Sequence, residues 1–151
     1  MVRGRVAFVT LDPTNLHATC VDMDGRGVLI LGPSGVGKST LAIHLITLGA
    51  RLVSDDRCCA IARDGVLIAT RPATLPKGIE ARGIGILNAP MCDETQVCYV
   101  VDLARAPASR YPDPQSIEIA GVHIPVISKT GLDGFAHSLY LLLKYGQIND
   151  L

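Results

Sequence analysis

One glycine-rich segment carries the residue types that bind phosphate groups. Residues 32–39 read GPSGVGKS and fit the pattern G-x-x-x-x-G-K-[S/T] at every fixed position. Glycines let a backbone wrap around phosphates with its amide N–H groups pointing inward. Lys38 can then reach the β- and γ-phosphates of ATP, and the Ser39 hydroxyl can ligate Mg²⁺. The predicted nucleotide-binding residues are Gly32, Pro33, Ser34, Gly35, Val36, Gly37, Lys38, Ser39 and Thr40.

Two adjacent carboxylates, Asp55 and Asp56, follow a short predicted strand over 52–54. Ligands of open α/β sheets bind beyond the carboxyl ends of the strands. One carboxylate there can help to hold Mg²⁺, while the other accepts a proton from an attacking hydroxyl group. A solvated turn is the alternative interpretation.

A second polar loop, residues 80–88, reads EARGIGILN. It can present Glu80 to a metal ion and Arg82 to a phosphate, with Gly83 and Gly85 shaping the backbone. An ordinary turn is equally compatible with this composition. His17 is ambiguous, because a single histidine at a strand start is more often structural than catalytic.

The elements that must position these residues can be read from hydrophobic periodicity and turn residues. A continuous apolar run over 28–31 predicts a strand buried on both faces, directly before the glycine-rich loop. Leu41, Leu45 and Leu48 predict a helix over 39–48, with Gly49 as its C-terminal cap. The other strands predicted in the first half are 6–11, 17–23, 52–54, 58–61 and 66–69, with turns at 12–15, 24–27 and 62–65.

The second half is predicted to contain more loop. A long stretch with Gly and Pro covers 71–90, and such stretches are usually functional or mobile. A strand over 97–103, a loop over 104–114 and a hairpin of 117–119 with 122–127 follow. A last helix over 134–144 can turn Phe135, Leu139, Leu142 and Leu143 toward a core. The fold class expected is α/β, with a mixed sheet and antiparallel hairpins.

Composition narrows the class of protein further. The 151 residues suit one domain, and 14 basic residues balance 14 acidic ones, which argues against a nucleic-acid binder. The five cysteines include no C-x-x-C pair, so neither disulfides nor zinc is indicated, and buried thiols are expected. No apolar run approaches the ~18 residues of a membrane span. We expect a cytoplasmic protein with no nucleic-acid or membrane partner.

Together these segments resemble the catalytic domain of the HPr kinase/phosphorylase family. His17 stands one strand and one hairpin before the SGVGKS core of the loop. RLVSDD at 51–56 is similar to the family's RLVADD, and 80–88 is similar to its EIRGLGII[N/D]. The resemblance covers about residues 5–145. It implies a domain related to phosphoenolpyruvate carboxykinase, usually hexameric, that phosphorylates a serine of the phosphocarrier protein HPr.

The resemblance also implies roles for single residues. By position, Asp56 resembles the general base, Asp55 supports the metal and the charge of the site, and His17 tunes the two carboxylates. Ser39 and Glu80 resemble the Mg²⁺ ligands. Arg110 is matched to a further catalytic arginine.

The sequence departs from the family in two places. It begins near the catalytic domain, so we expect a single domain over 1–151, without the regulatory N-terminal domain, as in the short proteobacterial form. Where longer enzymes carry PVRPGRN, residues 125–131 read PVISKTG, and Lys129 is the one nearby cation. Since both arginines are missing, we expect kinase activity with impaired phosphorolysis of phosphoserine-HPr. A shikimate- or gluconate-type small-molecule kinase and a non-catalytic nucleotide-binding regulator are the alternatives.

Overall fold

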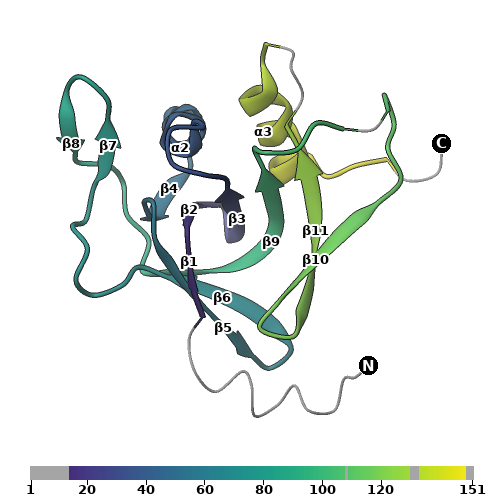
Figure 1. Cartoon of the computed structure of the whole chain (residues 1–151), viewed down its shortest axis with the longest axis horizontal. Helices are drawn as coiled ribbons and strands as arrows, with labels where there is room; N and C mark the ends of the chain where they lie inside the picture. Colours follow the sequence, from purple (N-terminus) through teal and green to yellow (C-terminus); the bar gives the residue numbers. More distant parts are fainter. Residues whose placement is uncertain (1–13, 108, 130–132, 149–151) are drawn as a thin grey trace.

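The computed structural model describes residues 14–107, 109–129 and 133–148. Within these ranges nine strands form one sheet, whose path runs β1-β5-β6-β9-β3-β2-β4, with β11 added on β9 and β10 on β11 (Figure 1). The strands are β1 Thr14–Leu16, β2 Ala18–Met23, β3 Arg26–Leu31, β4 Arg51–Ser54, β5 Cys58–Arg63, β6 Val66–Thr70, β9 Glu94–Asp102, β10 Gln115–Ile119 and β11 Val122–Ser128. The expected α/β class with a mixed sheet and antiparallel hairpins is confirmed.

The parallel part of the sheet consists of three neighbouring strands, β3, β9 and β11. Leu31 and Ser128 both lie opposite Asp102, so the three strands end at the same level. The glycine-rich loop leaves this edge directly after β3. The carboxyl edge of a parallel sheet is where α/β folds place their ligands.

Helix α2 (Lys38–Thr47) follows the loop, one residue earlier than predicted. Gly49 has φ 113, and its N–H bonds to the Ile46 carbonyl while the Ala50 N–H bonds to the Leu45 carbonyl. This pair of bonds is the Schellman motif, which requires a left-handed residue and therefore favours glycine. The predicted C-terminal cap is confirmed.

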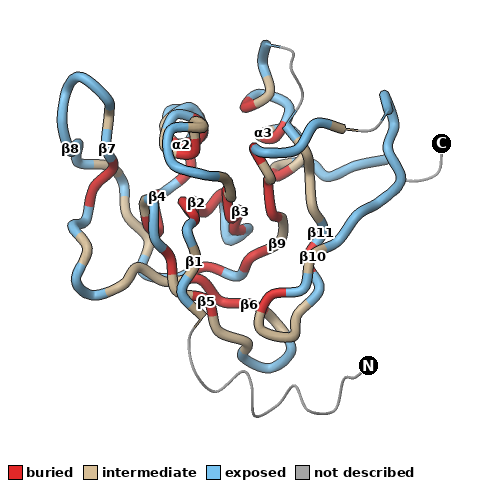
Figure 2. Tube along the Cα trace, in the orientation of Figure 1, coloured by how far each residue is buried: buried red, intermediate tan, exposed pale blue. Residues whose placement is uncertain are grey.

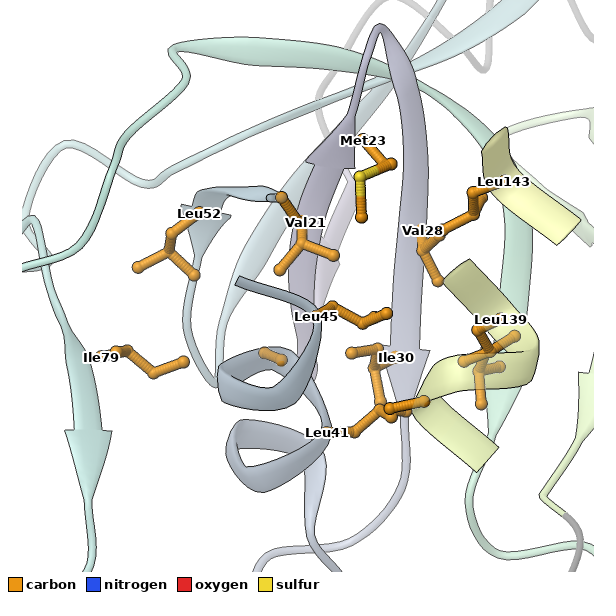
Figure 3. Packing of buried hydrophobic residues seen from close by; sticks show 14 of the residues in the cluster. Val21, Met23, Val28, Ile30, Leu41, Leu45, Leu52, Ile79, Leu139 and Leu143 are labelled. Atoms are coloured by element: carbon orange, nitrogen blue, oxygen red, sulfur yellow. The ribbon is translucent and has the colours of Figure 1, made fainter. Parts of the chain in front are cut away.

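Buried residues run along the central strands β2 and β3 (Figure 2). Their side chains divide between two separate apolar clusters. Val28 and Ile30 of β3 pack with α2 and α3 (Phe135–Tyr145), whereas Leu29 packs into the cluster on the opposite face. The close view of the helix side shows Leu41 and Ile30 next to Leu139 (Figure 3). The prediction that 28–31 is buried on both faces is therefore correct.

Helix α3 is held at its C-terminal end by the β2–β3 hairpin. The Arg26 guanidinium donates to the Leu143 carbonyl, and Lys144 forms an ion pair with Asp24 that lowers the pKa of that carboxyl group. Leu139 and Leu143 are buried as predicted. Leu142 is only half-buried, because the helical spacing gives the third inward position to Ala136.

Several predicted boundaries were wrong. Thr14 and Asn15 belong to β1, which pairs with β5, and not to a turn, because the partner strand supplies their hydrogen bonds. The strand expected from His17 begins at Ala18, after a bend. The 71–90 stretch contains a two-stranded hairpin, β7 (Ile79–Ala81) with β8 (Gly85–Leu87). The predicted strand over 6–11 and residues 12 and 13 of the predicted turn lie outside the described residues.

All five cysteines are free thiols in the structure. Cys20 and Cys58 are fully buried, and the other three are half-buried. A hydrogen bond with the Cys58 thiol, together with burial, raises the pKa of Cys20 well above its ordinary value, so this thiol stays protonated and apolar. Within the described ranges, neither helix is long and apolar enough to cross a lipid bilayer.

Candidate functional site

The glycine-rich loop ends at an uncapped helix N-terminus. Gly37 is the N-cap residue of α2, with φ 108, a left-handed conformation that glycine adopts without strain. No side chain caps this end, and the first turn carries no acidic residue. The first N–H groups of a helix lack partners inside the helix and attract anions. This end of α2 is therefore suited to a phosphate group.

Lys38 is 95% buried and lies inside the loop, because the chain folds around its ammonium group. Its Nζ donates to the carbonyl oxygens of Gly32 at 2.8 Å and Pro33 at 3.3 Å. Asp56 Oδ1 lies 3.8 Å from the same Nζ. Lys38 and Asp56 thus lie at one site.

Asp55 is fixed by donors from three parts of the chain. Its Oδ1 accepts hydrogen bonds from Ser39 Oγ at 2.6 Å and Thr19 Oγ1 at 3.0 Å, and its Oδ2 accepts one from the Glu80 amide at 3.0 Å. A carboxylate held on both oxygens has a defined orientation. The contact with Ser39 places Asp55 where it can support an ion bound by that hydroxyl.

Asp56 is held differently from Asp55. The Arg57 amide bonds to the Asp55 carbonyl at 2.8 Å across Asp56, whose φ is 68. This is a γ-turn with a left-handed central residue, a rare and strained conformation. The side chain of Asp56 remains 58% exposed and has Lys38 as its ion-pair partner. An exposed carboxylate on a constrained turn is accessible to a second molecule, which suits a proton acceptor.

Thr19 links the Asp55 carboxylate to the backbone amide of Asp56, and sequence reasoning missed it. Its buried Oγ1 donates to Asp55 Oδ1 and accepts a hydrogen bond from the Asp56 amide at 3.0 Å. The sequence offered only a weak signal, because Thr19 is one of two polar residues, with Asp22, among the apolar residues of β2.

The β7–β8 hairpin closes one side of the site. Glu80 and Arg82 line a cavity of about 280 Å³ together with Lys38, Ser39 and Asp56. Arg82 Nη2 lies 4.0 Å from the position that a Cβ would take at Gly35. The guanidinium group is therefore within reach of an anion held by the loop. Gly83 and Gly85, both with positive φ, shape the hairpin itself.

The oxygen groups of this cavity fit a magnesium ion. Among the residues described, no cluster of three or more His, Cys, Asp or Glu side chains is arranged to hold a metal. Mg²⁺ usually takes one or two protein ligands and completes its shell with water and substrate phosphates. Ser39 and Glu80 line the cavity and can supply two such ligands, and Asp55 lies behind Ser39, whose hydroxyl donates to it at 2.6 Å.

Three predicted catalytic residues do not line this cavity: Asp55, which is joined to it through its hydrogen bond with Ser39, and His17 and Arg110. His17 is exposed in the bend before β2, two residues from Thr19. Arg110 is exposed on the segment between β9 and β10. Their catalytic roles stay predictions.

One edge of the sheet combines a strand, a glycine-rich loop, a helix and an acid pair. This combination defines a P-loop protein. A family model described as HPr Serine kinase C-terminal domain matches residues 10–103. The chain belongs to this family.

Curated relatives agree with this assignment. The chain is 36% identical over 134 residues to the HPr kinase/phosphorylase of Streptococcus sanguinis strain SK36, and equally to that of Streptococcus pneumoniae strain Hungary19A-6. Each match covers 78% of this chain but 43% of the relative, so the chain spans less than half the length of the curated relatives it matches.

The fold agrees as well. The solved Hpr(Ser) kinase/phosphatase from Coxiella burnetii superimposes with a TM-score of 0.73, over 87% of this chain and 94% of that one, at 24% identity. The likeness establishes that the two chains share a fold, although most of their residues differ.

Proposed function

We propose that this domain transfers the γ-phosphoryl group of ATP to a serine of HPr or of an HPr-like phosphocarrier protein. The main observation behind this proposal is that the two adjacent aspartates have different surroundings. Asp55 is fixed by three donors, one of which is the Ser39 hydroxyl, whereas Asp56 is exposed beside Lys38. The two homologous streptococcal proteins are named HPr kinase/phosphorylase, which supports the same reaction.

The residues of the cavity have distinct parts in this reaction. The loop amides, Lys38 and Arg82 hold the phosphates, and Asp56 accepts the proton of the serine hydroxyl. A bond forms between the serine oxygen and the γ-phosphorus, the bond from that phosphorus to the β,γ-bridging oxygen breaks, and ADP leaves. Mg²⁺, held by Ser39 with support from Asp55 and Glu80, would neutralise the charge on the phosphates.

The role of Asp56 can be tested by substitution. An Asp56→Asn variant keeps the shape of the side chain but accepts no proton, so we expect kcat for HPr phosphorylation to fall by about 10²–10⁴-fold. ATP binding should be nearly unchanged. Single-turnover transfer of radiolabelled phosphate measures both effects, and near-normal transfer would remove Asp56 from the base role.

The reverse reaction is expected to be impaired. Residues 125–131 lack both arginines of the family segment, and Lys129 is exposed after β11. Phospho-HPr incubated with inorganic phosphate should release little pyrophosphate compared with the forward rate. Efficient pyrophosphate release would show that the two arginines are dispensable.

The hexamer and the cytoplasmic location also remain proposals from the family resemblance. Sedimentation of the purified protein tests the first, and a monomer at micromolar concentration would contradict it.

A further inference from the structure

A second cavity, of about 410 Å³, lies between α2 and α3. It is lined mainly by apolar atoms, in contrast to the polar cavity beside the acid pair. Its volume lies within the range of about 300–1,000 Å³ that small-molecule sites occupy. Figure 1 shows both helices standing over the edge at which β3, β9 and β11 end.

The two cavities meet at the end of the glycine-rich loop. Gly37 and Thr40 line both of them. A molecule whose phosphates occupy the polar cavity can therefore continue past Thr40 into the apolar one without crossing the protein core.

We infer that the cavity between α2 and α3 receives the ribose and base of the nucleotide. This inference rests on the proposed use of ATP. Leu41, His44 and Leu48 line one side of the cavity along α2, and Phe135 and Leu103 contribute apolar groups from the other elements. Thr40 and Leu48 are eight residues apart, or about 12 Å along the helix.

The surroundings of the cavity agree with a nucleoside ligand. Leu103 directly follows β9 and Lys129 directly follows β11, so residues at the ends of two parallel strands reach this cavity. Ligands bind at this edge in open α/β sheets. A half-buried aromatic ring, Phe135, offers a face against which a base can stack, while polar side chains at the rim can meet the ribose hydroxyls.

Photolabelling tests this placement on the unmodified protein. An azido-adenine analogue of ATP, irradiated in the presence of Mg²⁺, should label peptides containing residues 40–48 or 133–137. Excess ATP should suppress the labelling by competing for both cavities. Tripolyphosphate carries no nucleoside, so it should compete for the phosphate cavity alone. Suppressible labelling confined to other segments, such as the β7–β8 hairpin, would overturn the inference.

A pair of variants on one helix gives a second, independent test. Phe135→Ala should weaken ATP binding by about tenfold, the size expected for one lost base–aromatic contact, and leave tripolyphosphate binding unchanged. Tyr145→Ala removes an aromatic ring that is 74% exposed at the other end of α3, outside the cavity, and should change neither affinity. Equal weakening of ATP and tripolyphosphate by Phe135→Ala would contradict a nucleoside site.

The outcome is separable from that of the proposed function. Labelling of the expected peptides without phosphoryl transfer to HPr would refute the function and retain the nucleoside site. Transfer to HPr with labels elsewhere would refute the nucleoside site alone.

Discussion

At the scale of single residues, the chemistry was predictable where the reactive groups are close in sequence. Asp55 and Asp56 are adjacent, and Lys38 and Ser39 belong to one continuous pattern. Their residue types and order were therefore enough to nominate them as site residues. Thr19 was not predictable, because its partner Asp55 is 36 residues away and only the pairing of β2 with β4 brings them together. Long-range polar contacts of this kind leave little trace in a single sequence.

The Thr19 hydroxyl group holds the Asp55 carboxylate and the backbone of Asp56, and this gives a sharp prediction. Thr19→Val keeps the shape but removes one donor to Asp55 and the acceptor for the Asp56 amide. Such a loss typically costs about 1–3 kcal/mol, so we expect kcat for phosphoryl transfer to fall by roughly tenfold, with little change in KM for ATP.

Thr95→Val is the matched control for this variant. Thr95 is also buried, and its Oγ1 donates to a carboxylate, Asp22, at 2.6 Å, but it contacts neither Asp55 nor Asp56. This variant should lose stability and keep kcat. Similar falls in kcat for both variants would show that Thr19 acts through stability alone.

At the scale of elements, hairpins with glycine at the turn were predicted well. Asp24–Gly25, Asp64–Gly65 and Ala120–Gly121 all have two positive φ values, which is the conformation of a type I′ turn. The β7–β8 hairpin was missed because its strands have three residues each and all of β8, including Ile86, is exposed, so no alternation of buried positions marks them.

Helix α3 allows a direct measurement of how its packing contributes to stability. Leu139 is 3% exposed and packs in the cluster that covers the sheet, so Leu139→Ala should lower the free energy of unfolding by about 2–5 kcal/mol. Leu141, two residues further on and 57% exposed, serves as the control, and Leu141→Ala should change it by less than about 0.5 kcal/mol. Urea denaturation measures both. Equal effects would mean that α3 does not dock on the sheet as described.

At the scale of the whole molecule, the sequence indicated the class of fold but not the order of its strands. The pairing of β3 with β9 joins segments about 70 residues apart, and nothing local specifies it. That pairing makes the central part of the sheet parallel. It thereby brings the glycine-rich loop, the end of β9 and the end of β11 to one edge, where both cavities lie.

The central claim is that this site phosphorylates a protein serine. The most direct test incubates the full chain with ATP, Mg²⁺ and HPr from the same organism and measures the mass of HPr and the position of any phosphate. We predict that HPr gains one phosphoryl group on serine, and that Lys38→Ala abolishes this gain. Unmodified HPr together with active transfer to a small-molecule acceptor, or ATP binding without any transfer, would contradict the account.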